Sequence, residues 1–208
     1  MKKYTKIIAF LLTLTLAASA LISCGPKVEI DEVREILNDL LPKAEELNVI
    51  YFGEGLPISS DRELVEEFYS SFVSDIEMIN YHPVDPECGY TSEDDIRRAT
   101  LEVFTEGYSE YLFERAFSGI TAVMDQGKYN AIYAMYLMQY DTLTVRLDLA
   151  DDAIKLGRVY DVSTAEIVRK RSNYVIVSVS STLDGVASDI ELKLVKTTNG
   201  WRLDSPTY

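Results

Sequence analysis

The clearest hydrophobic pattern in this chain is a period of two along its last fifty residues. Apolar side chains take every second position in two stretches: Val175, Val177 and Val179, then Ile190, Leu192 and Leu194. A period of two is typical of strands with one buried face, because successive side chains point to opposite faces. Turn-forming residues at 183–185 and 199–200 separate the stretches. We therefore expect an antiparallel meander over residues 159–208.

The opening part of the chain has helical spacing instead. Between residues 31 and 48, apolar side chains recur three and four positions apart, which predicts an amphipathic helix. Asp31 is expected to cap its N-terminus. Pro42 is expected to kink or restart the helix, because proline lacks the amide donor and clashes with the preceding turn. A loop is expected over residues 50–57, and a second, short helix over residues 62–72.

Two capping signals mark the middle of the chain. Ser92, followed by Asp95, has the spacing of a capping box and predicts a helix start. Thr105 is expected to cap a further helix, which Gly119 can close. These signals predict two consecutive helices between residues 92 and 119.

Other stretches are less regular. Residues 72–84 favour an extended segment that ends at Pro83. Residues 129–138 are apolar and aromatic throughout, so they fit either a helix face or a buried strand. The turn-like residues 139–142 and the β-prone residues after them favour a hairpin. Residues 148–158 are polar and loop-like, with room for one helical turn.

Helices first and a curved antiparallel sheet last predict an α+β roll, in which the sheet buries one face against the helices. A mouth between helices and sheet is where rolls of this type hold ligands. No internal repeat or interdomain linker interrupts the pattern, so residues 31–208 are expected to form a single α+β domain.

The N-terminus has the layout of a secretory signal. Three lysines precede the apolar run 7–22, which ends in small residues and in Leu21-Ile22-Ser23-Cys24. Sixteen apolar-biased residues are short for a bilayer span, which needs about 20. The segment resembles a bacterial lipoprotein signal peptide with its lipobox. A short transmembrane anchor and an ordinary cleaved signal are the alternatives.

The lipobox resemblance implies that residues 1–23 are removed and that Cys24 is acylated. A diacylglyceryl group holds a protein stably, because two buried acyl chains are needed for a firm anchor. Residues 24–30 are then the lipidated cysteine and a tether that reaches about 20 Å at most. Gly25 follows the cysteine, so the aspartate that often marks inner-membrane retention is absent. The expected location is extracytoplasmic, on the cell membrane or, in a Gram-negative host, on an outer membrane.

The charge balance narrows the class of partner. The chain has a formal net charge of −14, which becomes −17 without the three lysines of residues 1–23. An acidic chain is unsuited to nucleic acid, which needs basic patches. The same sign argues against lying flat on anionic lipid. A basic protein groove is a compatible partner, and solubility alone is an equally good explanation.

The candidates for catalysis are few. His82 is the single histidine, and a Ser-His-Asp or Cys-His mechanism would have to use it; we expect it at a strand end or turn, on the surface. Cys88 is the one thiol left after acylation of Cys24, so no internal disulfide is possible. Acidic neighbours raise the pKa of a thiol and reduce its reactivity. We expect no catalytic role for either residue, and a chain that is not an enzyme.

No cofactor or metal site is expected. Glu93-Asp94-Asp95 and Asp151-Asp152 are the candidate calcium ligands, but a helix start and a solvated loop explain them better. One histidine and one free cysteine do not make a zinc site. No spacing singles out two of the 34 acidic residues as a glycosidase pair, and no glycine-rich phosphate loop is present. The fourteen tyrosines fit either half-buried core positions or the lining of a peptide or glycan groove.

Five stretches carry a family resemblance: residues 41–47, 53–57, 91–96, 103–105 and 200–208. Together they resemble uncharacterised lipoproteins of clostridia-type bacteria and, more distantly, the IseA family, which inhibits peptidoglycan DL-endopeptidases. The resemblance covers most of residues 30–208 and carries no active-site signature. It implies a cystatin-like or NTF2-like roll that binds a hydrolase and performs no reaction.

Two hypotheses for function follow. The first is a lipoprotein anchored to the bilayer through Cys24, whose domain binds a basic cell-wall hydrolase. The second is a lipoprotein that binds a small ligand or glycan in the mouth of the roll. The tyrosine count motivates the second hypothesis, and a mouth filled by Trp201 and tyrosines would argue against it.

Overall fold

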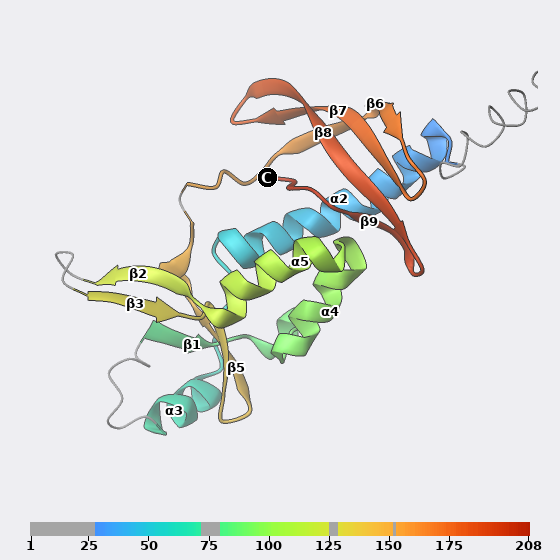
Figure 1. The fold of residues 1–208 in the computed structure, drawn as a ribbon. Helices are drawn as coiled ribbons and strands as arrows, with labels where there is room; N and C mark the ends of the chain where they lie inside the picture. Colours follow the sequence, from blue (N-terminus) through green and yellow to red (C-terminus); the bar gives the residue numbers. More distant parts are fainter. Residues whose placement is uncertain (1–27, 72–79, 125–128, 152) are drawn as a thin grey trace, which may run out of the picture.

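The computed structural model describes residues 28–71, 80–124, 129–151 and 153–208, so the signal segment and Cys24 lie outside it. It has the α+β architecture that the sequence predicts (Figure 1). The helices are α2 (Ile30–Phe52), α3 (Arg62–Ser70), α4 (Glu93–Val103) and α5 (Glu106–Phe113). A π-helical turn, η3 (Glu114–Ser118), continues α5 and ends at Gly119, as expected.

The C-terminal sheet is the predicted antiparallel meander. It has the order β6-β7-β8-β9, with β6 (Val159–Lys170), β7 (Tyr174–Leu183), β8 (Val186–Thr197) and β9 (Gly200–Leu203). Val175, Val177 and Val179 are at most 1% exposed, which confirms the alternation. The turn at 184–185 is confirmed, since Leu183 pairs with Val186. The last turn lies one residue earlier than expected, because Thr197 pairs with Gly200 around a loop of Thr198 and Asn199.

Helix α2 packs its apolar stripe against the buried face of this sheet. It runs unbroken through Pro42 and on to Phe52, so the helix does not restart at Pro42 and the loop expected from residue 50 begins only after Phe52. Proline lies on the exposed side of the helix, whereas Leu37 and Ala44 on the packed side are fully buried. Burial of that stripe outweighs the one backbone hydrogen bond that proline removes.

The start of α2 also differs from the prediction. The N-cap is Glu29, which makes no side-chain cap, and Asp31 lies in the first turn. Asp31 instead accepts a hydrogen bond from Arg34 at 3.2 Å. The same guanidinium donates to the carbonyls of Ser163 and Ala165 in β6, at 3.1 and 3.4 Å. Contact with the sheet therefore does more to fix this helix end than a cap does.

Helices α4 and α5 cover the other side of α2, with α5 in front in Figure 1. Both predicted caps are confirmed, since Ser92 accepts from the amide of Asp95 and Thr105 from that of Tyr108. The corner between the two helices is joined to β9, because the Thr105 amide donates to the Leu203 carbonyl at 2.9 Å.

A smaller sheet lies beyond the C-terminal end of α2, with the order β1-β5-β4. Its strands are β1 (Tyr81–Pro83), β4 (Tyr136–Gln139) and β5 (Thr142–Arg146), so the predicted hairpin with its turn after Gln139 is confirmed. The separate hairpin of β2 (Ile120–Met124) and β3 (Tyr129–Tyr133) was not expected. Single turns of 3₁₀ helix occur at Pro86–Cys88 and Leu147–Leu149. The extended segment expected from residue 72 lies mostly outside the described residues, and β1 forms its end.

The interior between α2 and the large sheet is filled. One hydrophobic cluster joins α2, both sheets and α4, and Trp201 belongs to it with 8% exposure. The expected mouth between helix and sheet is therefore occupied by side chains, and the two hollows that adjoin the large sheet lie at its edges.

Candidate functional site

His82 lies in β1 and faces α3. Its Nδ1 is 2.8 Å from the hydroxyl of Tyr69, which also donates to the Tyr81 carbonyl at 3.2 Å. These contacts dock α3 on the small sheet. The histidine therefore has a structural role at the position where the sequence predicts a strand end.

Cys88 closes the 3₁₀ turn after β1. Its Sγ is 3.8 Å from the carbonyl oxygen of Tyr90, and the thiol is half-buried and free. The thiol has no histidine or cation among its hydrogen-bond and ion-pair contacts in the described part of the chain. A neighbouring histidine or cation is one of the features that activate a cysteine.

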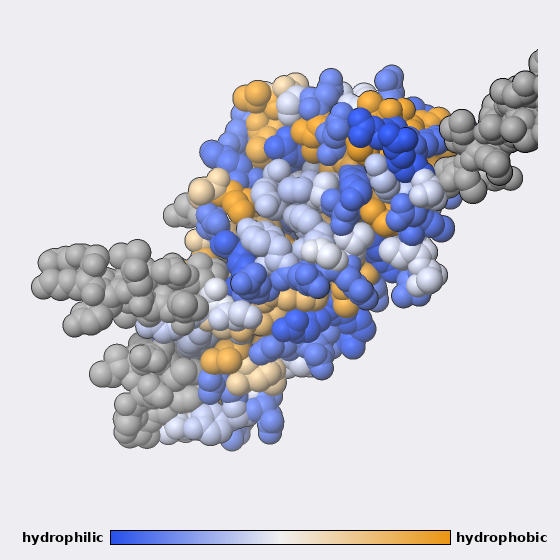
Figure 2. Space-filling view, viewed as in Figure 1, coloured by the Kyte–Doolittle hydropathy of each residue, from blue (hydrophilic) through white to orange (hydrophobic). Residues whose placement is uncertain are grey.

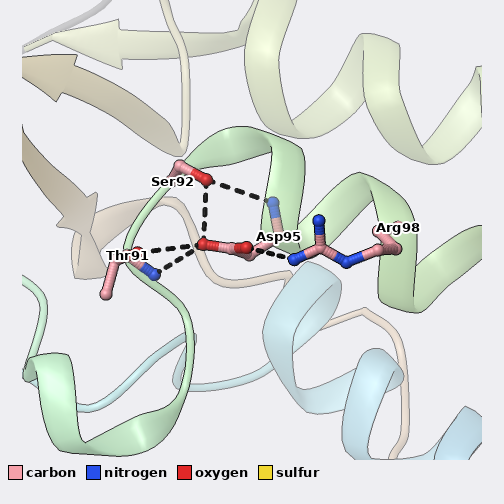
Figure 3. A network of polar contacts seen from close by, with 4 residues as sticks. All are labelled: Thr91, Ser92, Asp95 and Arg98. Carbon is pink, nitrogen blue, oxygen red and sulfur yellow. Dashed lines mark hydrogen bonds and ion pairs between the residues drawn. The ribbon is translucent and has the colours of Figure 1, made fainter.

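The acidic group at residues 93–95 forms the start of α4 (Figure 3). One oxygen of Asp95 accepts hydrogen bonds from the Thr91 amide, the Thr91 hydroxyl and the Ser92 hydroxyl, at 3.0, 3.0 and 2.8 Å. The other oxygen is paired with Arg98. The bonds from Ser92 and Thr91 hold the pKa of Asp95 well below its usual range. This carboxylate is fully engaged as a cap, so it is no open calcium ligand.

The second acidic pair is also engaged as far as the structure describes it. Asp151 accepts from the Ala153 amide at 3.1 Å and pairs with Arg115 at 3.1 Å, and Asp152 lies outside the described residues. Within the described ranges, no group of three or more His, Cys, Asp or Glu side chains is placed to hold a metal ion.

Most of the described tyrosines contribute to the core. Tyr51 and Tyr136 are at most 1% exposed, and Tyr81 is 3% exposed. The Tyr51 hydroxyl bonds to Thr100 at 2.7 Å, and that of Tyr81 donates to the Ala134 carbonyl at 2.8 Å. Burial raises the pKa of all three phenols. The core explanation of the tyrosine count therefore holds for these positions, and only a few rings, such as Tyr111, face solvent.

Arginines hold several of the elements together from the inside. Arg146 at the end of β5 is 1% exposed and donates hydrogen bonds to both carboxylate oxygens of Asp148, at 2.7 and 2.9 Å. Its guanidinium lies 3.7 Å from the centre of the Tyr133 ring. Arg115 similarly donates to the Tyr51 carbonyl and stacks over Phe52. These cations serve the fold, because carboxylates and rings surround them.

Two surface hollows adjoin the large sheet. One, of about 460 Å³, lies between the α4–α5 corner and the β8–β9 hairpin. The other, of about 290 Å³, follows the edge where α2 meets β6, with Leu37, Leu41 and Val162 in its wall. We call this second hollow the α2–β6 groove.

The acidic side chains are unevenly distributed along the fold. Residues 29–114, which contain every α-helix that the structure describes, carry 23 Asp and Glu against five Lys and Arg. Residues 115–208 carry eleven of each. The whole excess of negative charge therefore belongs to the helical half, and the sheets are neutral.

Helix α5 presents one row of this excess to solvent. Glu106, Glu110 and Glu114 are exposed, follow each other four residues apart and, among the described residues, join no ion pair. Tyr111 stands beside them, 49% exposed. We call these four residues the α5 acidic row. In Figure 2 the surface over α5 is mostly pale to blue, on the hydrophilic side of the scale.

Folding accounts for only part of the α5 acidic row. Glu106 lies in the first turn of α5, where the positive end of the helix dipole favours an acid. Like charges at this spacing destabilise a helix by about 0.2–0.5 kcal/mol per pair, and Glu114 stands toward the negative end of the dipole, so folding gives no reason for Glu110 and Glu114. The row was not predicted from the sequence, because the acidic balance was considered only as a net charge of the whole chain. The spacing of the three glutamates is nevertheless visible in the sequence.

No helix of the described ranges combines the length and the apolar character needed to cross a bilayer. Comparisons with known proteins add no family: no protein-family model matches the chain, and no curated protein matches it with significance.

Proposed function

We propose that this protein is an extracytoplasmic lipoprotein, anchored through Cys24, whose domain binds a basic partner protein and catalyses no reaction. The observation that carries this proposal is the α5 acidic row, in which three unpaired glutamates repel each other on one helix. A charge arrangement that costs stability is best explained by a partner that neutralises it.

The partner class that we propose is a cell-wall hydrolase. The resemblance to inhibitors of DL-endopeptidases points to such an enzyme, and a basic substrate groove would complement the acidic row. The exposed ring of Tyr111 adds the aromatic contact that protein interfaces favour, with acidic side chains on both sides.

The test is capture from host envelope extract with the mature chain from residue 24, carrying Cys24→Ser, at low and high salt. Recovery of an endopeptidase at low salt only, with slower muropeptide cleavage by that enzyme, is the expected result. The variant Glu106→Gln/Glu110→Gln/Glu114→Gln should weaken capture at least tenfold, because each charge contributes to the encounter and the complex.

A matched control removes the same charge from α3. Glu63, Glu66 and Glu67 are exposed there, and Glu66 is paired with Arg62 at 2.6 Å. Changing all three to glutamine should leave capture unchanged. If both triple variants lose capture of the partner equally, net charge alone explains the binding. If the domain inhibits none of the host's endopeptidases, the proposed partner class is rejected.

One observation favours a second candidate, a small ligand or glycan in the α2–β6 groove. Its apolar wall is joined by Tyr160 and by the polar groups of Asn38, Glu45 and Arg158. Its volume of about 290 Å³ is at the small end for ligand sites. Thermal shifts with muropeptides that vanish in Leu41→Phe, which narrows the groove, would support this candidate over the first.

A further inference from the structure

One end of the large sheet is basic although the chain as a whole is acidic. Arg169 and Lys170 end β6, Arg171 begins the turn to β7, and Lys196 lies near the end of β8. All four side chains are on exposed residues. The Lys196 amide donates to the Asn173 carbonyl at 2.7 Å, which brings the β8–β9 hairpin beside the β6–β7 turn. We call these four residues the basic end.

The opposite end of the same sheet carries acidic residues. Asp184 occupies the β7–β8 turn, and Asp161 and Asp189 both pair with Ser180 near that turn. Lys155 pairs with Asp184 at 3.0 Å, and Arg158 donates to Ser181 and Ser188 at this end. Acids and cations are therefore mixed here, whereas the charged residues at positions 169–173 around the β6–β7 turn are all basic. The net charge of the chain conceals this arrangement.

The chain enters the fold at the basic end. The Lys170 ammonium donates to the carbonyl of Val28 at 2.6 Å, and Val28 is fully buried. In Figure 1 the blue N-terminal end of α2 lies at the same end of the sheet as the β6–β7 and β8–β9 hairpins. Only three residues lie between Cys24 and Val28, so an anchor on that cysteine is at most about 14 Å away.

The charges around the basic end do not cancel it. Glu29 and Glu32 are exposed at the start of α2, while Asp31 is paired with Arg34. Lys193 is likewise paired with Asp204. The four cations of the basic end therefore exceed the two acids Glu29 and Glu32 at the start of α2. The exposed Glu35 and Glu166 lie farther along α2 and β6, and Lys27 precedes Val28 in the sequence.

We propose that the basic end docks on the anionic headgroups of the bilayer in which Cys24 is anchored, so that the domain stands end-on with its acidic helices and the β7–β8 turn exposed. This inference rests on the anchor of the proposed function. Charge complementarity acts within about 8 Å at physiological salt, and a tether of three residues allows the basic end to approach the bilayer that closely. The negative net charge disfavours an orientation in which the acidic helices face the anionic bilayer. It does not oppose contact through the basic end.

The test uses Trp201, the one tryptophan of the chain, which lies on β9 with the Lys196 ammonium 5.3 Å from its ring centre. The mature chain from Cys24, with Cys88→Ser, is coupled through the Cys24 thiol to a maleimide lipid in vesicles. Energy transfer from Trp201 to dansyl-labelled headgroups is then compared between phosphatidylcholine alone and phosphatidylcholine with phosphatidylglycerol.

Transfer should be higher on the anionic vesicles and should fall to the neutral value in about 1 M salt, where charges are screened beyond about 3 Å. Each basic side chain near an anionic surface contributes about fivefold to the ratio of docked to free protein. Arg169→Gln/Arg171→Gln should therefore lower that ratio roughly 25-fold. The matched control Arg62→Gln/Lys155→Gln removes the same charge from exposed ion pairs elsewhere and should keep the lipid effect.

Equal transfer on neutral and anionic vesicles, or equal loss in both double variants, would overturn the proposal. Loss of polyglutamate binding in Arg169→Gln/Arg171→Gln, without any lipid effect, would assign the surface to a soluble acidic macromolecule. Because the anchor is placed chemically, these outcomes bear on the basic end alone. Natural acylation of Cys24 is read separately from the mass of the mature chain, and partner binding from the α5 variants.

Discussion

The hydroxyl of Tyr136 donates a hydrogen bond to the carbonyl oxygen of Ile50 at 2.8 Å, and so joins the small sheet to the C-terminal end of α2. The same hydroxyl accepts from the amide of Leu56 at 3.0 Å. Tyr136 is fully buried. One phenol thus satisfies a carbonyl in the last turn of α2 and an amide in the loop after it, and it fixes how the chain turns after α2.

Removal of this hydroxyl should be costly. Tyr136→Phe leaves the Ile50 carbonyl and the Leu56 amide without their partner inside the protein, which should lower the free energy of unfolding by about 1–3 kcal/mol. Urea titration measures the change. Tyr111→Phe, on a ring that is 49% exposed, is the control and should have little effect. Equal stability of the two variants would show that water replaces the phenol.

The capping network of Asp95 predicts a dependence of stability on pH. Its hydrogen bonds with Ser92 and Thr91 lower the pKa of Asp95 in the folded state, whereas the unfolded value is about 3.9. A carboxyl with a depressed folded pKa contributes stability above the unfolded pKa, and the contribution is lost as the pH falls toward the folded pKa. The difference in unfolding free energy between wild type and Asp95→Asn should therefore be full at neutral pH and shrink below about pH 4.

The control for this pH dependence is Asp94→Asn. Asp94 is an exposed residue in the first turn of α4 and does not take part in the hydrogen bonds of the network. Asp94→Asn should therefore have less effect than Asp95→Asn on how far the unfolding free energy decreases as the pH falls. A pH-independent difference for Asp95→Asn would show that hydrogen bonding by either form of the side chain, and not the carboxylate charge, supports the helix start.

The sequence predicts those parts of the fold whose signals are local. The period of two along β7 and β8 and the caps at Ser92 and Thr105 depend on near neighbours, and the structure confirms them. The course of α2 through Pro42 depends instead on contacts with the distant sheet, which a local rule for proline does not include. β2 was missed because five residues after Gly119 carry too short a pattern.

Of the two candidate surfaces, one can be predicted from the sequence and the other cannot. The α5 acidic row can be found from a spacing of four residues on one helix. The basic end cannot, because Val28 and Lys170 are 142 residues apart and meet only in the folded chain. Arg169, Lys170 and Arg171 are consecutive in the sequence. Only the fold shows that they lie near the N-terminal end of the domain, which is what suggests contact with the bilayer.

Pro42 should limit the stability of α2. Because the helix continues through this residue, Pro42→Ala restores a backbone donor and relieves the clash with the preceding turn. Part of the gain is offset by the greater freedom of the unfolded chain, so we expect an increase in unfolding free energy of about 1–2 kcal/mol. Lys43→Ala, at a side chain that is 50% exposed, is the neighbouring control and should change little. A destabilised Pro42→Ala variant would mean that proline shapes the helix for packing in a way that alanine does not reproduce.

Removal of a charge from the α5 acidic row should raise the stability of the domain and weaken its binding to the partner. Glu110 lies four residues from both Glu106 and Glu114, so Glu110→Gln relieves two like-charge contacts and should raise the unfolding free energy by about 0.5 kcal/mol. The same substitution removes the central charge of the surface proposed for the basic partner, and capture of that partner should fall. A residue that only supports the fold would not gain stability when it is changed. Higher stability with unchanged capture would therefore remove α5 from the interface, whereas higher stability with weaker capture would identify the row as a surface that binding, and not folding, maintains.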